Sequence, residues 1–311
     1  MHWPTWWPRA LGKTSEPGAP LALVDNTHEL DGADGVTDPN YVAYDKKRLS
    51  YANTFENPWK ANTIRVMEWT TGKIRLLRLI RRFEREGVQT GQGFWAHALK
   101  VMGIDLITPE EQIARIPKTG PVIVVANHPH GLVDGMVLAE LIGRVRTDYK
   151  ILTRSLLTGI PEIEEFMIPV PFPHEENSLK KNLEMRKASN AHLENGGVIV
   201  LFPSGAVAAS ETYFGPAVEK EWNPFTAKMI QKSEAVVVPV FFPGQNSRWY
   251  QIANILSATL RQGLLLHEVV YALNKPQAPI VRAPIDRSEI AKWASNPRGF
   301  VAWLREKTLN D

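Results

Sequence analysis

The segment 127–135, with the sequence NHPHGLVDG, brings two histidines and an aspartate close together along the chain. A neutral imidazole, whose ordinary pKa is about 6.5, can take a proton from a hydroxyl near neutral pH. A carboxylate bound to the other ring nitrogen fixes the tautomer and stabilises the imidazolium as it forms. His128 and Asp134 therefore predict a general-base pair that could activate a substrate hydroxyl, so that the hydroxyl itself is the nucleophile.

The elements around this segment place it where α/β proteins bind ligands. Residues 122–126 (VIVVA) are continuously apolar, which predicts a strand buried on both faces, and a helix is expected over 134–144. In open α/β sheets ligands bind outside the carboxyl ends of strands, and backbone N–H groups at a helix start can stabilise an oxyanion or a phosphate. A structural alternative stays open, because His130 and Asp134, four residues apart, would be neighbours on any helix.

The rest of the chain alternates strand patterns with helix patterns. Further strands are expected at 149–153, 168–172, 198–202, 235–242 and 278–284, and helices at 178–195, 224–232 and 252–273. This alternation predicts an α/β fold with a mostly parallel central sheet flanked by helices. We expect one domain over 60–311, with its catalytic core at 121–284. Residues 1–59, rich in Pro, Gly, Asp and Asn, predict an irregular N-terminal extension.

A basic amphipathic section, residues 60–102, precedes the core. Within it, 60–86 and 94–102 predict helices, and 60–86 carries eight basic and three acidic groups. The arginines assigned to a membrane-facing side are Arg75, Arg78, Arg82 and Arg85. A basic amphipathic helix is typical of a membrane interface, although a surface helix with a solvated arginine face fits the same pattern.

Composition limits the setting in which the protein works. The 311 residues include no cysteine, which excludes disulfides, thiolate metal sites and a cysteine nucleophile. No apolar run reaches the roughly 18–20 residues needed to span a bilayer, and no secretory signal is visible. We expect a peripheral protein on an anionic membrane surface, at the cytoplasmic face of the inner (plasma) membrane. No nucleic-acid motif accompanies the arginine-rich helix, so no nucleic-acid partner is expected.

Residues 127–135 resemble the first motif of the lysophospholipid and glycerolipid acyltransferases, the PlsC-like superfamily. In that family the usual spacing is His-x4-Asp, whereas five residues separate His128 from Asp134. The phrase NHPHGLVDG is similar to the hemolysin-like and ornithine-lipid O-acyltransferase branch, in which an Asn-His-Pro-x-Gly-x-x-Asp-Gly form is familiar. The departure therefore indicates a sub-branch and argues against glycerol 3-phosphate as the acceptor.

Two later segments carry the same resemblance. Residues 201–205 (LFPSG) are similar to the family's Phe-Pro-Glu-Gly motif, which lines the acceptor site, with Ser204 in place of the carboxylate. Residues 238–240 (VPV) look like its last motif, which shapes the acyl site. The turn 243–248 (PGQNSR) is similar to the hemolysin-like branch, and Arg248 can pair with an acidic headgroup in a fork geometry.

The resemblance implies a lipid-modifying enzyme with a defined set of site residues. Such an enzyme moves a fatty acyl group from acyl-carrier protein or coenzyme A to a lyso-lipid hydroxyl, with lyso-ornithine lipid and lysophosphatidate as the first acceptors to test. His128 would be the general base and Asp134 would orient it, with no metal and no cofactor beyond the acyl thioester. The residues expected to contact substrate are Asn127, His130, Gly131, Arg154, Phe202, Pro203, Ser204, Gly205, Pro239 and Arg248.

Three other functions fit parts of the sequence. A metal-dependent hydrolase could use His128, His130 and Asp134 as ligands, although the usual metallo-β-lactamase spacing is missing. A serine esterase would need Ser204 in a nucleophile elbow, whose flanking glycines are missing. A non-catalytic membrane-binding protein would explain the arginine-rich helix, but it would have no use for His128 and Asp134.

Overall fold

The chain is described over most of its length by a computed structural model. The described residues are 50, 52, 57–153, 160–171 and 177–310. The predictions for Arg154 and for nearly all of the extension 1–59 lie outside these residues.

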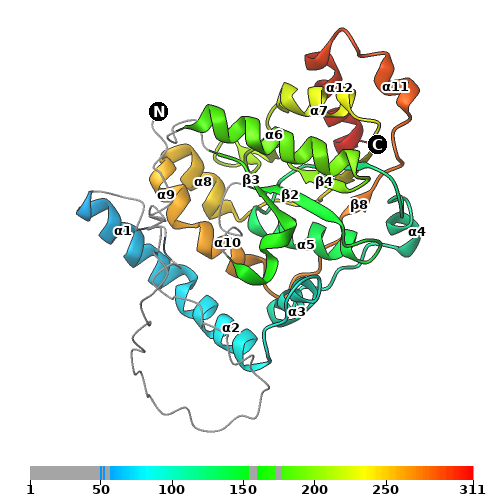
Figure 1. Ribbon diagram of the computed structural model, residues 1–311. Coiled ribbons are helices and arrows are strands. Elements are labelled where there is room, and N and C mark those ends of the chain that lie inside the picture. The colour runs from blue at the N-terminus through cyan, green and yellow to red at the C-terminus, as the bar shows by residue number, and fades with distance from the viewer. Residues whose placement is uncertain (1–49, 51, 53–56, 154–159, 172–176, 311) are drawn as a thin grey trace, which may run out of the picture.

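A six-stranded sheet forms the centre of the molecule (Figure 1). From one edge to the other its strands are β3 (Met167–Pro169), β2 (Tyr149–Thr153), β4 (Val198–Leu201), β1 (Val122–Ala126), β7 (Val236–Phe241) and β8 (Ile280–Val281). The first five run parallel, and β8 pairs antiparallel with β7. The mostly parallel sheet predicted from the sequence is therefore confirmed.

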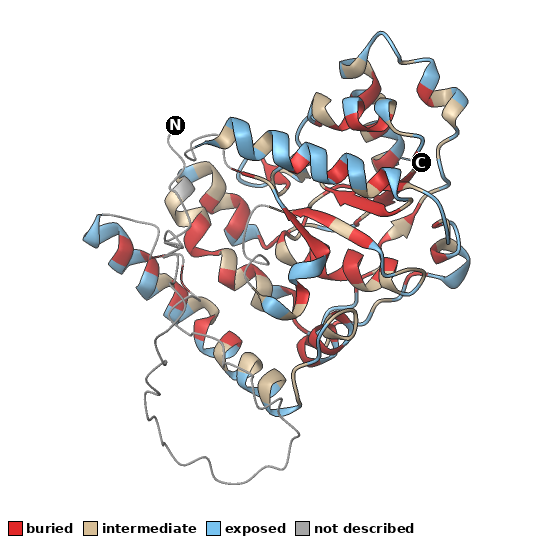
Figure 2. Ribbon diagram, in the orientation of Figure 1, coloured by how far each residue is buried: buried red, intermediate tan, exposed pale blue. Residues whose placement is uncertain are grey.

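Helices cover both faces of the sheet. Those on one face are α3 (Gly93–Met102) and α5 (Leu132–Gly143), and those on the other are α6 (Ser178–Glu194), α7 (Pro224–Lys232) and α12 (Pro297–Asn310). Alternate β1 side chains enter the two cores, Val124 the first and Val125 the second. All of β1 is buried, as the red strands in Figure 2 show. Because each such side chain contributes about 1.5–3 kcal/mol by burial, β1 holds the segment after it in a fixed place.

The helix predicted over 60–86 is helical along its length but is not one continuous helix. α1 (Pro58–Glu68) and α2 (Ile74–Arg85) are joined by a π-helical turn (Trp69–Lys73), in which Gly72 has a non-helical backbone and kinks the segment. Asn57 starts α1, because its side chain accepts hydrogen bonds from two backbone N–H groups of the first turn. The segment runs along one side of the molecule (Figure 1).

The predicted continuous helix 252–273 is wrong. The structure has three helices there: α8 (Arg248–Leu256), α9 (Ala258–Gly263) and α10 (Leu265–Ala272). The break after α8 has a local cause, because Ser257 takes an extended backbone and its side chain caps α9. α10 then packs on the π-helical turn, where a Cβ on Gly72 would come within 2.8 Å of Val270.

Several shorter elements differ from the sequence-based expectations. The strand expected at 278–284 is limited to β8, and the one expected at 168–172 is β3, which follows a 3-10 helix (Pro161–Phe166). Elements that periodicity did not predict are α4 (Glu110–Ile113), α11 (Arg287–Ala291), α12 and the hairpin of β5 (Ala209–Ser210) and β6 (Ala217–Val218). The hairpin comes next after β4 in the chain.

Candidate active site

The candidate site lies at the carboxyl ends of three neighbouring strands. Asn127 and His128 follow β1, Phe202 follows β4 and Phe242 follows β7. This edge of the sheet is where open α/β folds bind ligands. The structure therefore brings together segments that are 115 residues apart at the extremes, as the Asn127–Phe242 hydrogen bonds show.

Asp134 lies between the two histidines and binds both. Its Oδ2 is 3.0 Å from Nδ1 of His128, and its Oδ1 is 2.9 Å from Nδ1 of His130. The same Oδ2 also accepts the backbone N–H groups of His130, at 2.8 Å, and Gly131, at 3.0 Å. The predicted His128–Asp134 contact is present, but Asp134 is shared equally with His130.

The carboxyl group of Asp134 is held in its ionised form. Complete burial opposes ionisation, yet the hydrogen bonds from His128 and His130 outweigh it and the pKa lies below the ordinary value. A carboxylate can only accept hydrogen bonds, so each neutral ring presents an Nδ1–H to it. The tautomer that follows leaves Nε2 of His128 with a free lone pair, as a general base requires.

The ring and backbone of His128 are fixed from several sides. Its ring stacks on Phe202, with ring centroids 4.0 Å apart. Its backbone N–H donates to Oε2 of Glu219 at 3.1 Å, and its carbonyl accepts the N–H of Ala208 at 2.8 Å. These contacts hold the His128 side chain in one orientation, which a residue that reacts with a substrate requires.

The ring of His130 lies against Gly244 in the loop after β7. A Cβ at position 244 would come within 3.0 Å of Nε2 of His130, and the backbone there has a φ of 96°, which favours glycine. The side chain of His130 is 13% exposed, compared with 19% for His128. Nε2 of His130, the ring nitrogen that does not face Asp134, therefore lies against the loop at Gly244. This contact distinguishes it from Nε2 of His128.

Asn127 fastens the end of β1 to the end of β7. Its buried side chain donates to the Phe242 carbonyl at 2.8 Å and accepts the Phe242 N–H at 2.7 Å. Both groups of Phe242 would lose their partner if the amide were removed, and unsatisfied buried groups cost about 1–3 kcal/mol each. This role is structural and differs from the substrate contact predicted for Asn127.

Asn127→Ala is therefore expected to lower the free energy of unfolding by about 2–4 kcal/mol. Chemical denaturation followed by circular dichroism measures this change. Asn190→Ala is the matched control, because Asn190 is exposed on α6. Equal stabilities of the two variants would contradict the fastening role.

The backbone N–H groups of the turn that leads into α5, which the sequence suggested for binding an oxyanion or a phosphate, already donate hydrogen bonds within the protein. The N–H groups of His130 and Gly131 bind Asp134, and that of His128 binds Glu219. These three donors hold the turn in shape. An oxyanion would therefore need donors other than these three.

The Phe-Pro-Ser-Gly segment lies beside the pair, as predicted. Phe202 contacts His128, and Pro203 is buried. The Ser204 hydroxyl donates to the Ala206 carbonyl at 2.9 Å, and Gly205 is exposed with a φ of 62°. A hydroxyl bound to a backbone carbonyl does not match the serine-esterase alternative, in which it would bind an imidazole.

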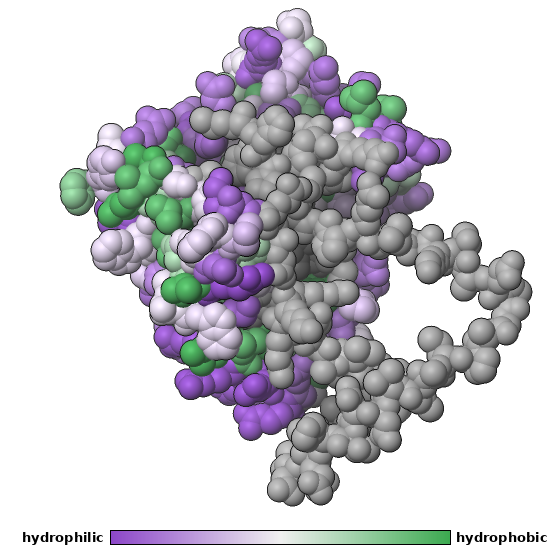
Figure 3. Space-filling model, turned by 90° about the vertical axis from the view of Figure 1, so that its left-hand side faces the viewer, coloured by the Kyte–Doolittle hydropathy of each residue, from purple (hydrophilic) through white to green (hydrophobic). Residues whose placement is uncertain are grey.

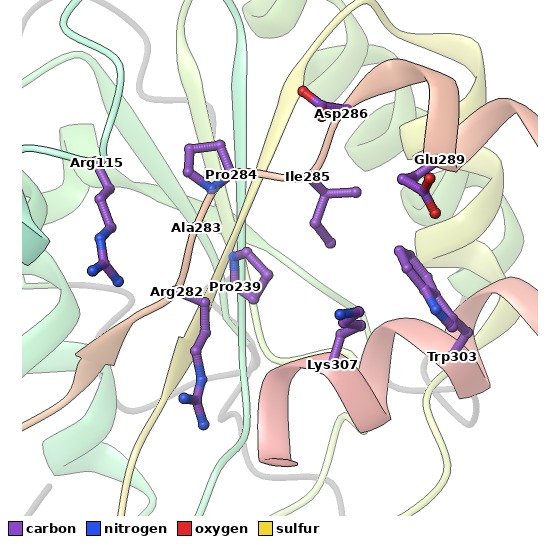
Figure 4. A pocket seen from close by; sticks show the side chains of 10 residues that line it. All are labelled: Arg115, Pro239, Arg282, Ala283, Pro284, Ile285, Asp286, Glu289, Trp303 and Lys307. Carbon is purple, nitrogen blue, oxygen red and sulfur yellow. The ribbon is translucent and has the colours of Figure 1, made fainter. Parts of the chain in front are cut away.

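Two other residues predicted to contact substrate, Arg248 and Pro239, have other neighbours in the structure. Arg248, exposed at the start of α8, donates to the Gly215 carbonyl at 2.6 Å and so braces the β5–β6 loop. Pro239 faces the other side of the sheet from Val238 and Val240, which belong to the core under α5. It lines a separate open pocket with Ile285 and Trp303 (Figure 4). Pro239 therefore lies on the opposite face of the sheet from these core residues.

Charged side chains also line the pocket that contains Pro239. Arg115 donates to the Val281 carbonyl at 2.6 Å, and Arg282 donates to the carbonyls of Thr308, at 3.4 Å, and Leu309, at 3.5 Å. Figure 4 shows both guanidinium groups at the wall of the pocket. These contacts tie the last residues of α12 to the sheet edge, which is a structural task.

The metal-site alternative requires a different orientation of the same residues. Both Nδ1 atoms point at the Asp134 carboxylate as hydrogen-bond partners instead of converging with it on one point. Among the described residues, no group of three His, Asp or Glu side chains is arranged to hold a metal ion. The geometry therefore favours an orienting role for Asp134.

Glu219, which follows β6, is the site residue that sequence reasoning missed. It is buried, and burial raises its pKa against the opposing hydrogen bonds from the His128 N–H, Ser204 and Trp222. It belongs to the short stretch AVEKEWN, which matches no motif, and it lies 91 residues from His128 in the chain. Its only sequence signal was one of two glutamates in a mixed stretch of apolar and charged residues, which is not specific.

The fold and site define the class of protein, an α/β domain with a histidine–carboxylate pair at the carboxyl edge of its sheet. A family model described as "Acyltransferase" matches residues 89–275, more than half of the chain. The chain therefore belongs to this acyltransferase family, and the resemblance noted in the sequence is confirmed at that level.

Known relatives match a shorter stretch. The chain is 30% identical over 149 residues to a lyso-glycine lipid O-acyltransferase of Bacteroides thetaiotaomicron, which is 47% of this chain and 52% of that protein. It is 29% identical over 150 residues to the protein of the same name from Phocaeicola vulgatus, 47% of this chain and 50% of that protein. The chain thus spans about half the length of these curated relatives.

A solved structure with a related arrangement is that of the 1-acyl-sn-glycerophosphate acyltransferase PlsC from Thermotoga maritima. The match has a TM-score of 0.45 and 14% sequence identity, and it covers 82% of this chain and 81% of the other.

Proposed function

We propose that this protein transfers a fatty acyl group from an acyl thioester to the hydroxyl of a lyso-lipid, with His128 as general base. The single observation that carries the proposal is the hydrogen bond between Nδ1 of His128 and the buried, ionised Asp134, at the edge of the sheet. It leaves Nε2 of His128 with a lone pair for the acceptor hydroxyl. Membership of the acyltransferase family supports the reaction class.

The proposed reaction needs no covalent enzyme intermediate. The acceptor oxygen attacks the thioester carbonyl while its proton moves to Nε2 of His128, and Asp134 stabilises the imidazolium that forms. The tetrahedral intermediate then collapses, the carbon–sulfur bond breaks, and the proton on His128 passes to the departing thiolate. The products are an ester and a free thiol on the carrier, so atoms and charge balance.

The acceptor is proposed to be an acylated amino-acid lyso-lipid. The two relatives at about 30% identity are named lyso-glycine lipid O-acyltransferases, and the first motif is similar to the ornithine-lipid branch. Lyso-glycine lipid and lyso-ornithine lipid share a lone hydroxyl on a fatty chain next to an amino-acid headgroup. Lysophosphatidate remains the comparison acceptor, and acyl-carrier protein and coenzyme A remain the two candidate donors.

A matrix of donors and acceptors tests the proposal. Radiolabelled palmitoyl-coenzyme A and palmitoyl-acyl-carrier protein are each incubated with lyso-glycine lipid, lyso-ornithine lipid or lysophosphatidate, and the lipids are separated. We expect ester formation with an amino-acid lyso-lipid to exceed that with lysophosphatidate by at least about ten-fold, roughly 1.4 kcal/mol in the barrier. Transfer to none of the three by the wild-type protein, or hydrolysis alone, would overturn the proposal.

We also propose that α1, the π turn and α2 rest on the membrane surface that holds the acceptor. Trp59 on α1 is 82% exposed and Trp69 in the π turn is 51% exposed. Five arginines farther along, in α2, are also exposed: Arg75, Arg78, Arg81, Arg82 and Arg85. Figure 3 views the side of the molecule on which α1 lies, where apolar and charged groups adjoin. Among the described residues no helix is long and apolar enough to cross a bilayer.

Reversing two arginine charges is expected to weaken binding to anionic vesicles. Each basic side chain near such a surface contributes about 1 kcal/mol, so Arg78→Glu/Arg85→Glu should lower the vesicle partition coefficient by about thirty-fold or more. Co-sedimentation with vesicles containing phosphatidylglycerol measures it, and added salt should reduce wild-type binding because it screens surface charges.

A charge-matched control tests whether position matters. Lys118→Glu/Arg298→Glu changes the same number of exposed charges outside the α1–α2 segment. If this control loses as much binding as the α2 variant, or if wild-type binding is insensitive to salt, the proposed membrane surface is wrong. Trp59→Ala/Trp69→Ala should also reduce binding, because tryptophan is favoured at the bilayer interface.

A further inference from the structure

A second buried acidic side chain, that of Glu219, contacts the turn that carries His128. Its Oε2 accepts the backbone N–H of His128 at 3.1 Å, and its Oε1 accepts the indole N–H of Trp222 at 3.2 Å. The Ser204 side chain lies beside the same carboxyl group, while its hydroxyl donates to the Ala206 carbonyl. The proposed acyl-transfer mechanism uses none of these contacts directly.

The backbone of Glu219 is also held in place. Its carbonyl accepts a 2.6 Å hydrogen bond from the guanidinium of Arg305, which α12 presents from the second core. This bond fixes the backbone from which the Glu219 side chain reaches His128. The N–H of Ala208 also donates to the His128 carbonyl. Both backbone groups of His128, its N–H and its carbonyl, are therefore bound by the segment between β4 and α7.

Two carboxylates together account for the amides of the turn. Asp134 binds the N–H groups of His130 and Gly131, and Glu219 binds the N–H of His128. Hydrogen bonds to these two side chains therefore fix the backbone of the turn, and with it the point from which the His128 ring projects.

We propose that Glu219 is a positioning residue, which fixes His128 for proton transfer through its backbone amide. It also supplies a buried carboxylate to the segment 202–205, in which Ser204 stands where the resemblance leads one to expect a glutamate. The proposal rests on the proposed function, because it assigns His128 the role of general base. Glu219 itself touches neither substrate nor reacting atoms.

Glu219 is an acid in a buried position. Burial raises its pKa, and the hydrogen bonds from the His128 N–H and the Trp222 indole oppose that shift. These two bonds compensate part of the cost of burying the carboxyl group.

The test separates a positioning role from a purely structural one. Glu219→Gln weakens the acceptor for the His128 N–H, and Trp222→Phe removes the other donor to the same carboxyl group while leaving the His128 contact in place. Glu221→Gln is the charge control, because Glu221 is exposed two residues away. For each variant, kcat and KM are measured with the donor and acceptor pair that gives the highest wild-type rate, well below its Tm and per folded molecule. Hydrogen exchange of the peptide covering 127–131 is followed by mass spectrometry.

We expect Glu219→Gln to lower kcat by about 10- to 100-fold, to change KM less than about three-fold and to speed exchange at 127–131. Trp222→Phe should lower Tm but leave kcat within about three-fold, and Glu221→Gln should change neither. If Glu219→Gln does not fold, Glu219→Asp replaces it in the test. Its side chain is one methylene shorter, so the carboxyl group is moved away from the His128 N–H.

Two results would overturn the positioning role. One is a kcat of folded Glu219→Gln within two-fold of wild type, and the other is a loss in Trp222→Phe as large as that in Glu219→Gln. If the wild-type protein transfers no acyl group, the proposed function fails, and the exchange measurement alone then decides whether Glu219 fixes the turn.

Discussion

His128→Ala is expected to abolish acyl transfer, with kcat lowered by about 10²–10⁴-fold or more. General-base catalysis contributes a factor of this size, and no other described group is placed to replace Nε2 of His128 at the same point. The side chain is partly exposed and its ring stacks on Phe202, so its removal should cost little stability compared with its effect on rate. Release of labelled lipid ester, measured at saturating donor and acceptor, reports the change.

His130→Ala is the matched control for this prediction. Both rings bind the same carboxylate, at 3.0 Å and 2.9 Å, but Nε2 of His130 lies against Gly244. We expect His130→Ala to lower kcat by no more than about ten-fold, through a looser Asp134, a difference of about 1.4 kcal/mol in the barrier. A larger loss in His130→Ala than in His128→Ala would exchange the roles of the two histidines and refute the assignment made here.

The position of this site was readable from the sequence because it depends on local patterns. The run VIVVA predicted β1, and a strand buried on both faces must end in a turn, so His128 and Asp134 were bound to lie at a sheet edge. The segments LFPSG and PGQNSR were expected at the same edge of the sheet. The structure places them there, because they follow β4 and β7, the two strands that pair with β1. Order along the chain and strand endings were sufficient for these predictions.

The partners of the catalytic turn could not be read in the same way. Glu219 and Ala208 reach His128 from the β5–β6 hairpin, whose strands of two residues each have no detectable period. Asn127 looked like part of a substrate motif, yet its amide is used to bind Phe242. Contacts of this kind depend on side-chain direction after folding, which residue type and spacing leave open.

Errors in the helices had local causes. Helix 252–273 was predicted as continuous because its apolar spacing runs past Ser257, but that hydroxyl competes for the backbone and caps a new helix. Pro239, assigned to the acyl site by motif, lies on the other face of the sheet from Val238 and Val240, as the two-residue alternation of β7 requires, and its substrate role stays a prediction. For the helix, one backbone position decided the outcome against the wider pattern.

Asp134→Asn is the second change with a large expected effect, and it should act on both rate and stability. Three N–H donors meet at Oδ2, so the amide oxygen is expected to take that place and the new NH₂ group to face Nδ1 of His130. His128 then keeps its tautomer but loses the negative charge that stabilises its imidazolium. We expect kcat to fall by about 10²–10⁴-fold.

The stability effect should depend on pH with a defined sign. Although burial opposes it, the two histidines lower the pKa of Asp134 in the folded protein, so the ionised group stabilises the fold above its unfolded-state pKa of about 3.9. Asp134→Asn should therefore lower the free energy of unfolding by about 2–3 kcal/mol at pH 7. That difference should narrow as the pH falls below about 4, through the folded-state pKa. Urea denaturation at several pH values measures it, with Asp105→Asn, an exposed aspartate, as control. A difference that stays constant down to pH 3 would show that the Asp134 charge does not hold the two histidines.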